Sequence, residues 1–271
     1  MMDLQTIVDI PKAPFCIEPE ETMLFVGSCF AAEIGGRATD DHLRTIVNPY
    51  GVMYNPASVC HTVIKAVGDG TIPEHGVSTA IFTLGTNHVY ILNETGEIVD
   101  NCMKRPQNLF TERELSIDEC AGYLRDAVQM LRKCNSDTRV ILTVSPIRYR
   151  KYGYHGSQLS KSTLLLAADK IVRELDGCMY FPAYELMNDE LRDYRFYKPD
   201  MLHPSEQAAD YIYEHFKDAC FSRRTMEYIN EWRPIRQALS HRPLNPDAQE
   251  YVDFMEDTRR RVAEFNAKWK L

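Results

Sequence analysis

Short apolar runs that stop at a glycine or a proline constrain the fold of this chain more than any other feature. The run at 23–26 ends at Gly27, and comparable runs occupy 80–84, 139–144 and 178–181. Each has the length and the continuous apolar character of a buried parallel strand. Helical patterns lie between them, and strands that alternate with helices form a mostly parallel sheet with helices on both faces. The pattern therefore predicts an α/β fold.

The helical segments are expected at 30–43, 116–134 and 158–175. The second one begins with Ser116 and Glu119 at the spacing of a capping box, in which two side chains satisfy orphan backbone N–H groups. Two further apolar runs, 89–92 and 97–99, are separated by the sequence Asn-Glu-Thr-Gly. This spacing predicts a β-hairpin.

The charge and the apolar pattern exclude several classes of partner. The formal net charge is −8, which disfavours binding to nucleic acid or to an anionic membrane through overall electrostatic attraction. No apolar run approaches the roughly 18 residues of a membrane span. Residues 1–14 show no basic stretch followed by an apolar one, as a secretory signal has. We therefore expect a soluble, cytoplasmic protein that binds neither nucleic acid nor a membrane.

The cysteines and histidines do not have the spacing of a metal or redox motif. The eight cysteines contain no C-x-x-C pair, so a zinc ribbon and a thioredoxin-type motif are disfavoured. In a chain without an export signal, most of them are expected to be reduced and buried. No H-x-x-x-H pair and no glycine-rich phosphate loop occurs. We expect no metal and no cofactor.

The segment 222–271 differs in character from the rest of the chain. Its apolar side chains, with one threonine, recur at helical spacing at Tyr251, Phe254, Met255, Thr258, Val262, Phe265 and Trp269. Three consecutive arginines at 259–261 are expected to form a solvated face, because three charges do not make a basic groove. We therefore expect a main domain over 1–221 and a helical extension over 222–271 that packs on it.

The turn Gly27-Ser28-Cys29 joins the first predicted strand to the first predicted helix. Such a turn delivers its residues to the carboxyl edge of a parallel sheet, where open α/β folds bind ligands. A thiol at the start of a helix also gains from the partial positive charge of the helix N-terminus, which lowers its pKa. Cys29 is therefore the cysteine that we expect to act as a nucleophile.

Two further motifs carry groups that would complete such a site. In Gly85-Thr86-Asn87, the Asn87 amide is of the type that donates a hydrogen bond to a developing oxyanion. Further on, Asp200 and His203 lie three residues apart, a spacing at which the carboxylate orients an imidazole that acts as general base. Each motif is weak alone, but their order along the chain predicts nucleophilic catalysis.

Other motifs extend the pattern over roughly residues 20–220. They are Gly27-Ser28-Cys29-Phe30-Ala31, Asn48-Pro49-Tyr50-Gly51, Asn55-Pro56-Ala57-Ser58, Thr83-Leu84-Gly85-Thr86, Asn101-Cys102 with Lys104, Thr143-Val144-Ser145-Pro146-Ile147-Arg148, Ser160-Lys161 and Asp200-x-x-His203-Pro204-Ser205. On these motifs the chain resembles the GSCFA-domain family, which looks like a branch of the SGNH (GDSL-type) hydrolases. The resemblance implies a three-layer α/β/α flavodoxin-like fold with a mostly parallel sheet.

The resemblance also implies roles for individual residues. In the hydrolases the nucleophile stands third in a Gly-Asp-Ser-Leu turn. That position is Cys29 here, with Ser28 in place of the aspartate. A loop glycine that supplies a backbone N–H to the oxyanion corresponds to Gly51, and the Gly-x-Asn oxyanion motif corresponds to Asn87. At both positions the alternative is a residue that only forms a turn.

The Asp-x-x-His block of the hydrolases corresponds to Asp200 and His203, which implies a Cys-His-Asp mechanism. The expected function is that of a hydrolase, an acyl esterase or an acyltransferase, acting on an ester-linked acyl group of a small molecule or a saccharide. Ser28 is the alternative nucleophile if the turn is offset by one residue, and its other expected role is to cap the helix. A non-catalytic ligand-binding module and a thiol redox sensor are the other hypotheses, although no resolving cysteine lies near Cys29 in the sequence.

The loop after the strand at 139–144 is rich in charged and aromatic residues. We expect Arg148 to pair with an acidic neighbour rather than to bind an anionic group of a substrate. Tyr149, Tyr152 and Tyr154 are expected to form a substrate-contacting loop, with a packed surface loop as the alternative. Lys161 belongs to the resemblance, but the sequence suggests no mechanism for it.

Overall fold

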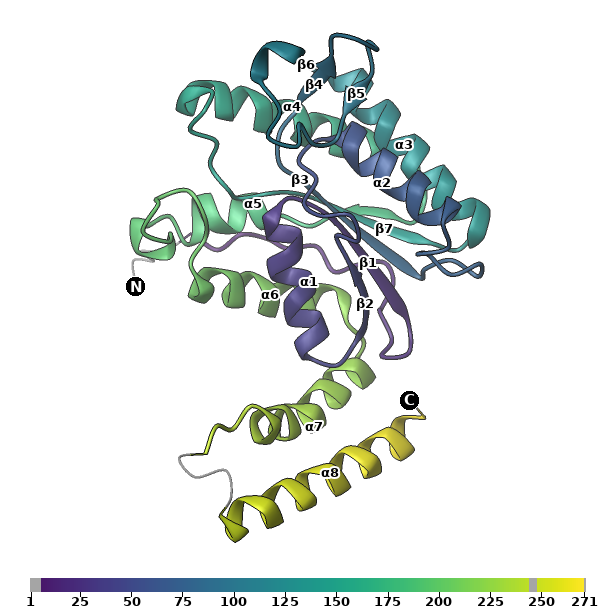
Figure 1. Ribbon diagram of the computed structural model, residues 1–271, viewed down its shortest axis with the longest axis vertical. Helices are drawn as coiled ribbons and strands as arrows, with labels where there is room; N and C mark the ends of the chain where they lie inside the picture. Colours follow the sequence, from purple (N-terminus) through teal and green to yellow (C-terminus); the bar gives the residue numbers. More distant parts are fainter. Residues whose placement is uncertain (1–5, 244–247, 271) are drawn as a thin grey trace.

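The computed structural model describes residues 6–243 and 248–270. Its centre is a five-stranded sheet in the order β2-β1-β3-β7-β8, in which all neighbouring strands are parallel. The strands are β1 (Thr22–Gly27), β2 (Arg44–Val47), β3 (Thr79–Leu84), β7 (Arg139–Val144) and β8 (Cys178–Tyr180). Counted among themselves, these strands have the order 2-1-3-4-5 of a flavodoxin-like sheet. The predicted fold class is confirmed (Figure 1).

Helices cover both faces of this sheet. The helices of the main domain are α1 (Cys29–Asp40), α2 (Pro56–Gly68), α3 (Ile117–Cys134), α4 (Gly153–Glu174), α5 (Ala183–Glu185), the π-helical turn η2 (Leu186–Glu190), the 3-10 turn η3 (Tyr194–Phe196) and α6 (Glu206–Cys220). One core contains α2, α3 and α4 and the other contains α1, α5 and α6. Successive strand residues point to opposite faces, so Phe25 belongs to the second core and Val26 to the first. The result is a three-layer α/β/α arrangement.

Most of the predicted elements are present. β1, β3, β7 and β8 follow the four apolar runs closely, and α4 begins at Gly153, earlier than the expected 158. The capping box of α3 is confirmed: Ser116 Oγ accepts a hydrogen bond from Glu119 N–H at 3.2 Å, and the Glu119 carboxylate accepts one from Ser116 N–H at 2.8 Å. Three elements are not predicted from the sequence: β2, α2 and the strand β6 (Phe110–Glu114).

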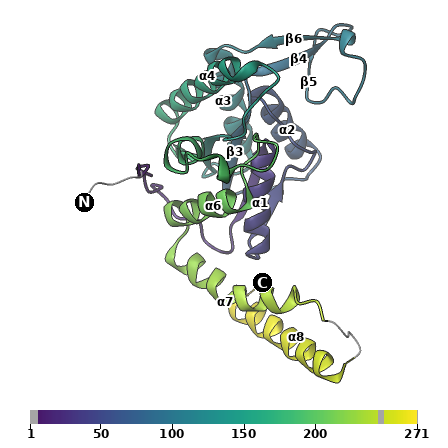
Figure 2. The same ribbon diagram turned by 90° about the vertical axis from the view of Figure 1, so that its left-hand side faces the viewer.

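A second, antiparallel sheet is inserted between β3 and α3. Its strand order is β5-β4-β6, and it consists of β4 (His88–Leu92), β5 (Ile98–Val99) and β6, which the 3-10 turn η1 (Gln107–Leu109) precedes. β4 and β5 are the predicted hairpin. Figures 1 and 2 place this sheet at one end of the long axis of the molecule, with the last two helices at the other end.

The last two helices, α7 (Arg223–Leu239) and α8 (Gln249–Trp269), form a helical hairpin. The α7 residue Trp232 contacts the main domain: its ring stacks on His42 with 3.9 Å between centroids, and its Nε1 donates to Asp40 O at 2.9 Å. In the predicted apolar stripe of α8, Thr258, Phe265 and Trp269 are buried, whereas Phe254 is exposed. The extension therefore packs on the main domain, while the division into domains 1–221 and 222–271 stays a prediction.

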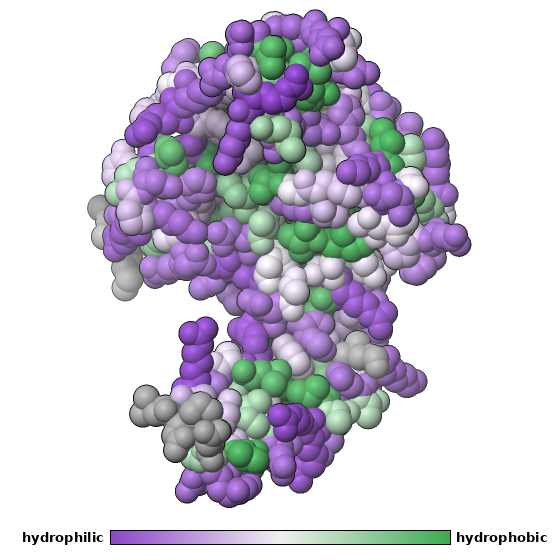
Figure 3. All heavy atoms as spheres, viewed as in Figure 1, coloured by the Kyte–Doolittle hydropathy of each residue, from purple (hydrophilic) through white to green (hydrophobic). Residues whose placement is uncertain are grey.

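The surface of the molecule in Figure 3 is mostly hydrophilic, and its apolar residues form small groups between polar ones. None of the helices in the described part of the chain is both long enough and apolar enough to cross a bilayer. Residues 1–5, which belong to the N-terminal segment in which we expect no export signal, lie outside the described residues.

Candidate active site

The turn between β1 and α1 presents Cys29 at the carboxyl edge of the sheet. Gly27 has a φ of +150°, and a Cβ there would lie 2.1 Å from Thr83 O on the neighbouring strand β3, so only glycine fits. Ser28 is buried, and its Oγ accepts a hydrogen bond from Phe30 N–H at 3.3 Å, which confirms its role as the N-cap of α1. Cys29, the first residue of α1, is half-buried. The thiol is thus the more accessible of the two candidate nucleophiles.

Burial raises the pKa of the Cys29 thiol. The backbone N–H groups of Cys29 and Phe30 lower this pKa, as expected at the start of a helix, but desolvation of the thiolate is the larger effect. The Glu33 carboxylate raises the pKa further. The prediction that the helix N-terminus leaves Cys29 with a lowered pKa is therefore wrong. Near neutral pH the group is a thiol, and a nucleophilic attack by it requires a base.

Asp200 and His203 form the pair that their spacing predicts. Asp200 Oδ2 lies 2.6 Å from His203 Nδ1, and Oδ1 accepts hydrogen bonds from the N–H groups of Leu202 at 2.8 Å and of His203 at 3.0 Å. The backbone N–H groups are the largest cause of an Asp200 pKa of about 2. The carboxylate is therefore ionised near neutral pH. In the tautomer that donates from Nδ1, the Nε2 atom of His203 is an acceptor.

Cys29 and His203 line one cavity at the carboxyl edge of the parallel sheet. Its volume is about 510 Å³, within the range of small-molecule sites. We call it the sheet-edge cavity; the other residues that line it are Val52, Tyr54, Asn55, Thr86, His88, Tyr90, Val99, Asp100, Asn101, Cys102, Ile147, Arg148, Tyr149, Arg150, Lys151, Tyr152 and Leu202. Within the residues that the structure describes, no hydrogen bond joins His203 to Cys29. The two groups therefore share a cavity without a hydrogen bond between them in the described part of the chain.

Gly51 forms a turn rather than part of an oxyanion hole. Its φ is +92°, and its N–H donates to Asn48 O at 2.8 Å, so this N–H is not available to an oxyanion. The role expected for Gly51 is corrected accordingly. The same motif has a function that is not predicted from the sequence: Asn48 Oδ1 accepts a hydrogen bond from Gly27 N–H at 2.8 Å. Asn48 thereby fixes this loop against the turn that carries Cys29.

Asn87 also has a different role from the one expected. It is buried, its Nδ2 donates to Leu115 O at 2.8 Å, and its backbone N–H donates to Ser160 Oγ at 3.0 Å. The amide therefore bonds the start of α3 instead of lining the sheet-edge cavity, which its neighbour Thr86 lines. Asn87 ties the loop after β3 to α4 and to the start of α3, which is a structural function.

Lys161, on α4, is a buried titratable group that interacts electrostatically with Cys29. Its Nζ donates to Gly85 O and to Ser145 O, both at 2.7 Å, so one side chain joins the loops that follow β3 and β7. Burial lowers the pKa of Lys161 to about 7, and the interaction with Cys29 opposes this. Lys161 in turn lowers the pKa of Cys29. The sequence suggests no mechanism for Lys161, whereas in the structure its amine positions two loops of the site.

The tyrosine-rich loop forms a wall of the sheet-edge cavity. Tyr149 and Tyr152 line the cavity, and Tyr152 stacks on His88 with 3.6 Å between ring centroids. Burial raises the pKa of both tyrosines. Tyr154 is exposed and lies against the guanidinium of Arg148, with 4.3 Å from Cζ to the ring centroid. Contact of these tyrosines with a substrate stays a prediction.

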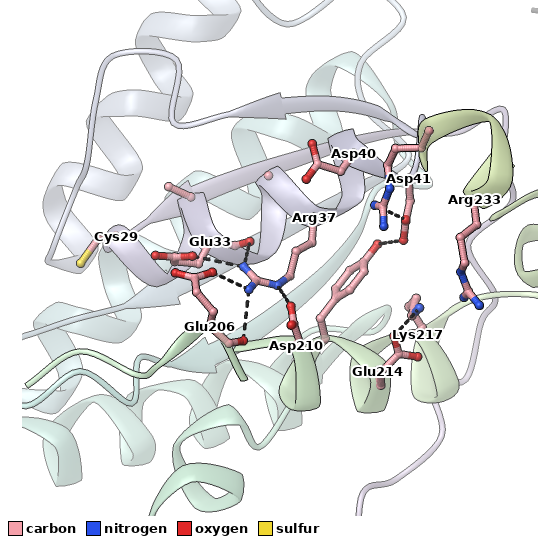
Figure 4. Close-up of a pocket in the computed structure, with 14 residues that line it drawn as sticks. Cys29, Glu33, Arg37, Asp40, Asp41, Glu206, Asp210, Glu214, Lys217 and Arg233 are labelled. Carbon is pink, nitrogen blue, oxygen red and sulfur yellow. Dashed lines mark hydrogen bonds and ion pairs between the residues drawn. The ribbon is translucent and has the colours of Figure 1, made fainter. Parts of the chain in front are cut away.

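A second hollow, the helical cleft, lies between α1 and α6 and extends to α7 (Figure 4). Its volume is about 1000 Å³. At its centre Arg37 forms ion pairs with Glu33, Glu206 and Asp210 at 3.1, 2.9 and 2.7 Å. Cys29 lies at one end, and in Figure 4 its sulfur points away from the Arg37 network. The charge of Arg37 is thus paired within the cleft.

Together these features define the class of protein. The chain is a three-layer α/β/α protein in which the turn after the first strand delivers Cys29 to a cavity, and the loop before α6 delivers His203, which Asp200 contacts, to the same cavity. Among residues 6–243 and 248–270, no three His, Cys, Asp or Glu side chains gather as metal ligands would. The GSCFA family matches residues 22–80 and 74–216, and the C-terminal domain of GSCFA domain proteins matches residues 232–270. The chain belongs to the GSCFA family, and the resemblance is confirmed.

Several solved structures of esterases are distantly similar to this chain. A catalytic mutant of Axe2, an acetylxylan esterase from Geobacillus stearothermophilus, is 13% identical with a TM-score of 0.49, and the match covers 77% of this chain and 98% of that one. A carbohydrate esterase of family 3 from Talaromyces cellulolyticus is 11% identical with a TM-score of 0.41, over 78% and 99% of the two chains. Similarity at this level does not establish an activity. Among curated proteins, none matches the sequence significantly.

Proposed function

We propose that this protein is a hydrolase or acyltransferase that acts on an ester-linked acyl group of a small molecule or a saccharide. The observation that carries the proposal is the sheet-edge cavity, which Cys29 and His203 both line. His203 has the orienting carboxylate that a general base requires, with 2.6 Å between Nδ1 and Asp200 Oδ2. The reaction type, attack on an ester-linked acyl group, is proposed from the motifs by which the chain resembles the SGNH hydrolases.

The first half of the reaction forms a thioester. His203 Nε2 accepts the proton of the Cys29 thiol as the sulfur attacks the acyl carbonyl carbon. Because burial raises the pKa of the thiol, proton transfer accompanies the attack rather than preceding it. Asp200 stabilises the imidazolium, which then gives its proton to the leaving alkoxide oxygen. The alcohol departs, and the acyl group remains on Cys29.

The developing oxyanion needs a donor other than those expected. The backbone N–H of Gly51 already donates to Asn48 O, and the side-chain amide of Asn87 already donates to Leu115 O. The backbone N–H of Cys29, at the start of α1, lies near the sulfur and lowers the pKa of the thiol, so it faces the region in which negative charge develops. One such donor is typically worth about 3 kcal/mol in the transition state.

The second half releases the acyl group. Water, or an alcohol or amine acceptor, gives a proton to His203 and attacks the thioester carbonyl, and the imidazolium returns that proton to the Cys29 sulfur. A thioester reacts with acceptors other than water, so transfer and hydrolysis are two outcomes of one intermediate.

The test is the hydrolysis of p-nitrophenyl acetate by purified protein. We expect Cys29→Ala and His203→Ala each to lower kcat/KM by about 10³-fold, in line with the loss of a nucleophile or a general base. His75→Ala, which removes an exposed histidine outside both cavities, is the matched control and retains the wild-type rate. Hydrolysis that persists in His203→Ala would overturn the mechanism.

A second candidate function is a non-catalytic binding module. It is favoured by the raised pKa of Cys29 and by the missing hydrogen bond between Cys29 and His203 in the described part of the chain. This function predicts that an ester binds in the sheet-edge cavity and dissociates unchanged, with no acyl group transferred to the protein.

A further inference from the structure

Arg148 lines the sheet-edge cavity without an acidic partner. Within residues 6–243 and 248–270, no carboxylate lies within ion-pair distance of its guanidinium. The prediction that Arg148 pairs with an acidic neighbour is therefore wrong. Three tyrosine rings surround it instead, with distances from Cζ to the centroids of 4.3 Å for Tyr154, 5.5 Å for Tyr197 and 5.9 Å for Tyr194.

Most N–H donors of the Arg148 guanidinium have no hydrogen-bond partner among the residues that the structure describes. Nη1 donates to Met201 O at 3.2 Å, while a guanidinium carries five N–H donors. Aromatic faces attract a cation but do not accept its hydrogen bonds in the plane of the guanidinium. Arg148 is thus held in place and keeps donors for a planar anionic group, which it can bind in a bidentate manner.

The charges around Arg148 reinforce this preference. Arg150 and Lys151 also line the sheet-edge cavity, whereas Asp100 is its single acidic residue and already bonds His61 Nδ1 at 2.9 Å. Lys151 pairs with Glu112 at 2.8 Å. A cavity with an excess of cationic side chains is notable in a chain of net charge −8. Such a cavity concentrates anions locally.

Arg148 lies on the same side of the cavity as the general base. Its backbone N–H donates to Leu202 O at 3.1 Å, and its side chain donates to Met201 O. Both acceptors immediately precede His203, the group that returns a proton to the leaving oxygen in the proposed reaction. The alcohol half of a bound ester therefore lies toward Arg148.

From this geometry we infer, resting on the proposed function, that the substrate is an acyl ester whose alcohol half carries a carboxylate or a phosphate, and that Arg148 binds this group. Arg148 is a specificity-determining residue: it selects anionic esters over neutral ones of the same shape. The central arginine of the helical cleft, Arg37, differs from Arg148 because three carboxylates pair with it.

A first experiment tests anion binding without ester turnover. Cys29 is alkylated with iodoacetate, which is anionic, and with iodoacetamide, its neutral counterpart, and mass spectrometry gives both rates at the Cys29 peptide. We expect the ratio of the two rates to fall about fivefold or more in Arg148→Gln, and less in Arg148→Lys, which keeps the charge. Arg173→Gln removes an exposed arginine whose partner is Asp169 and leaves the ratio unchanged. Raising the ionic strength lowers the ratio in the wild-type protein, a result that requires no variant.

A second experiment places the anion in the alcohol half. It compares kcat/KM for 4-acetoxybenzoate, 4-acetoxyphenyl phosphate and the neutral methyl 4-acetoxybenzoate, each relative to its spontaneous hydrolysis. We expect one of the anionic esters to be preferred over the neutral one by about tenfold, and this preference to collapse in Arg148→Gln. Equal rates for anionic and neutral esters, or an alkylation ratio insensitive to Arg148, would overturn the inference. An Arg148-dependent alkylation ratio without ester turnover would instead overturn the proposed function and leave the anion site standing.

Discussion

Replacement of the buried Lys161 tests the electrostatics of the site most quantitatively. Burial lowers the pKa of Lys161 from 10.5 to about 7, so the unfolded chain binds more protons than the folded one between these two values. Stability therefore rises with pH across this window. The full shift corresponds to about 5 kcal/mol, and between about pH 7 and about pH 9 the gain is about 2 kcal/mol.

The assay is urea unfolding of wild-type protein and of Lys161→Met at both pH values. The difference between the free energies of unfolding of the two proteins cancels the contributions of all titrating groups that the substitution does not affect. We expect the wild-type protein to gain about 2 kcal/mol relative to Lys161→Met as the pH rises. The same comparison in a Cys29→Ala background removes the coupling between the two groups, and Lys161→Gln serves if the methionine variant does not fold. A stability difference that is constant with pH would show that Lys161 has an ordinary pKa, and would refute the reasoning.

Other perturbations address the turn, the loop and the Asp–His pair. Ser28→Ala removes the N-cap of α1 and is expected to lower the free energy of unfolding by about 1 kcal/mol in urea titrations; no loss would contradict the capping role. Gly27→Ala places a Cβ against Thr83 O and is expected to abolish folding, as measured by circular dichroism. Asn87→Ala is expected to lower the free energy of unfolding by about 1–3 kcal/mol with kcat of the folded protein retained, and a selective loss of kcat would restore its oxyanion role. Because the pKa of Asp200 is lowered to about 2, its contribution to stability is present above its unfolded pKa of 3.8 and is lost as the pH falls toward 2. When the stability of Asp200→Asn is measured over the same acid range, this loss of stability should be absent.

The parallel sheet was predictable because its central strands are buried on both faces. β1, β3 and β7 are therefore continuous apolar runs, which stand out in the sequence. β2 is a half-exposed edge strand that begins with an arginine, and its pattern is correspondingly weak. α2 was missed although it carries two local signals: Asn55 caps it and Pro56 occupies its first turn.

The candidate site was predictable only where it depends on local spacing. Asp200 and His203 are three residues apart, so one loop suffices to bring them together. The direction of the Asn87 amide instead depends on Leu115, which lies far along the chain. The pKa of Cys29 depends on burial, and the helix N-terminus is visible in the sequence whereas the surrounding side chains are not. Lys161 acquires a role only once the loops after β3 and β7 are adjacent.

The central claim is that Cys29 forms an acyl-enzyme with help from His203. The most direct measurement is to mix the protein with p-nitrophenyl acetate, quench the reaction early, and map the acetyl group by peptide mass spectrometry. The account predicts acetyl on Cys29 in the wild-type protein and none at that position in His203→Ala. Acetyl on Ser28, or on scattered lysines with Cys29 unmodified, would contradict it.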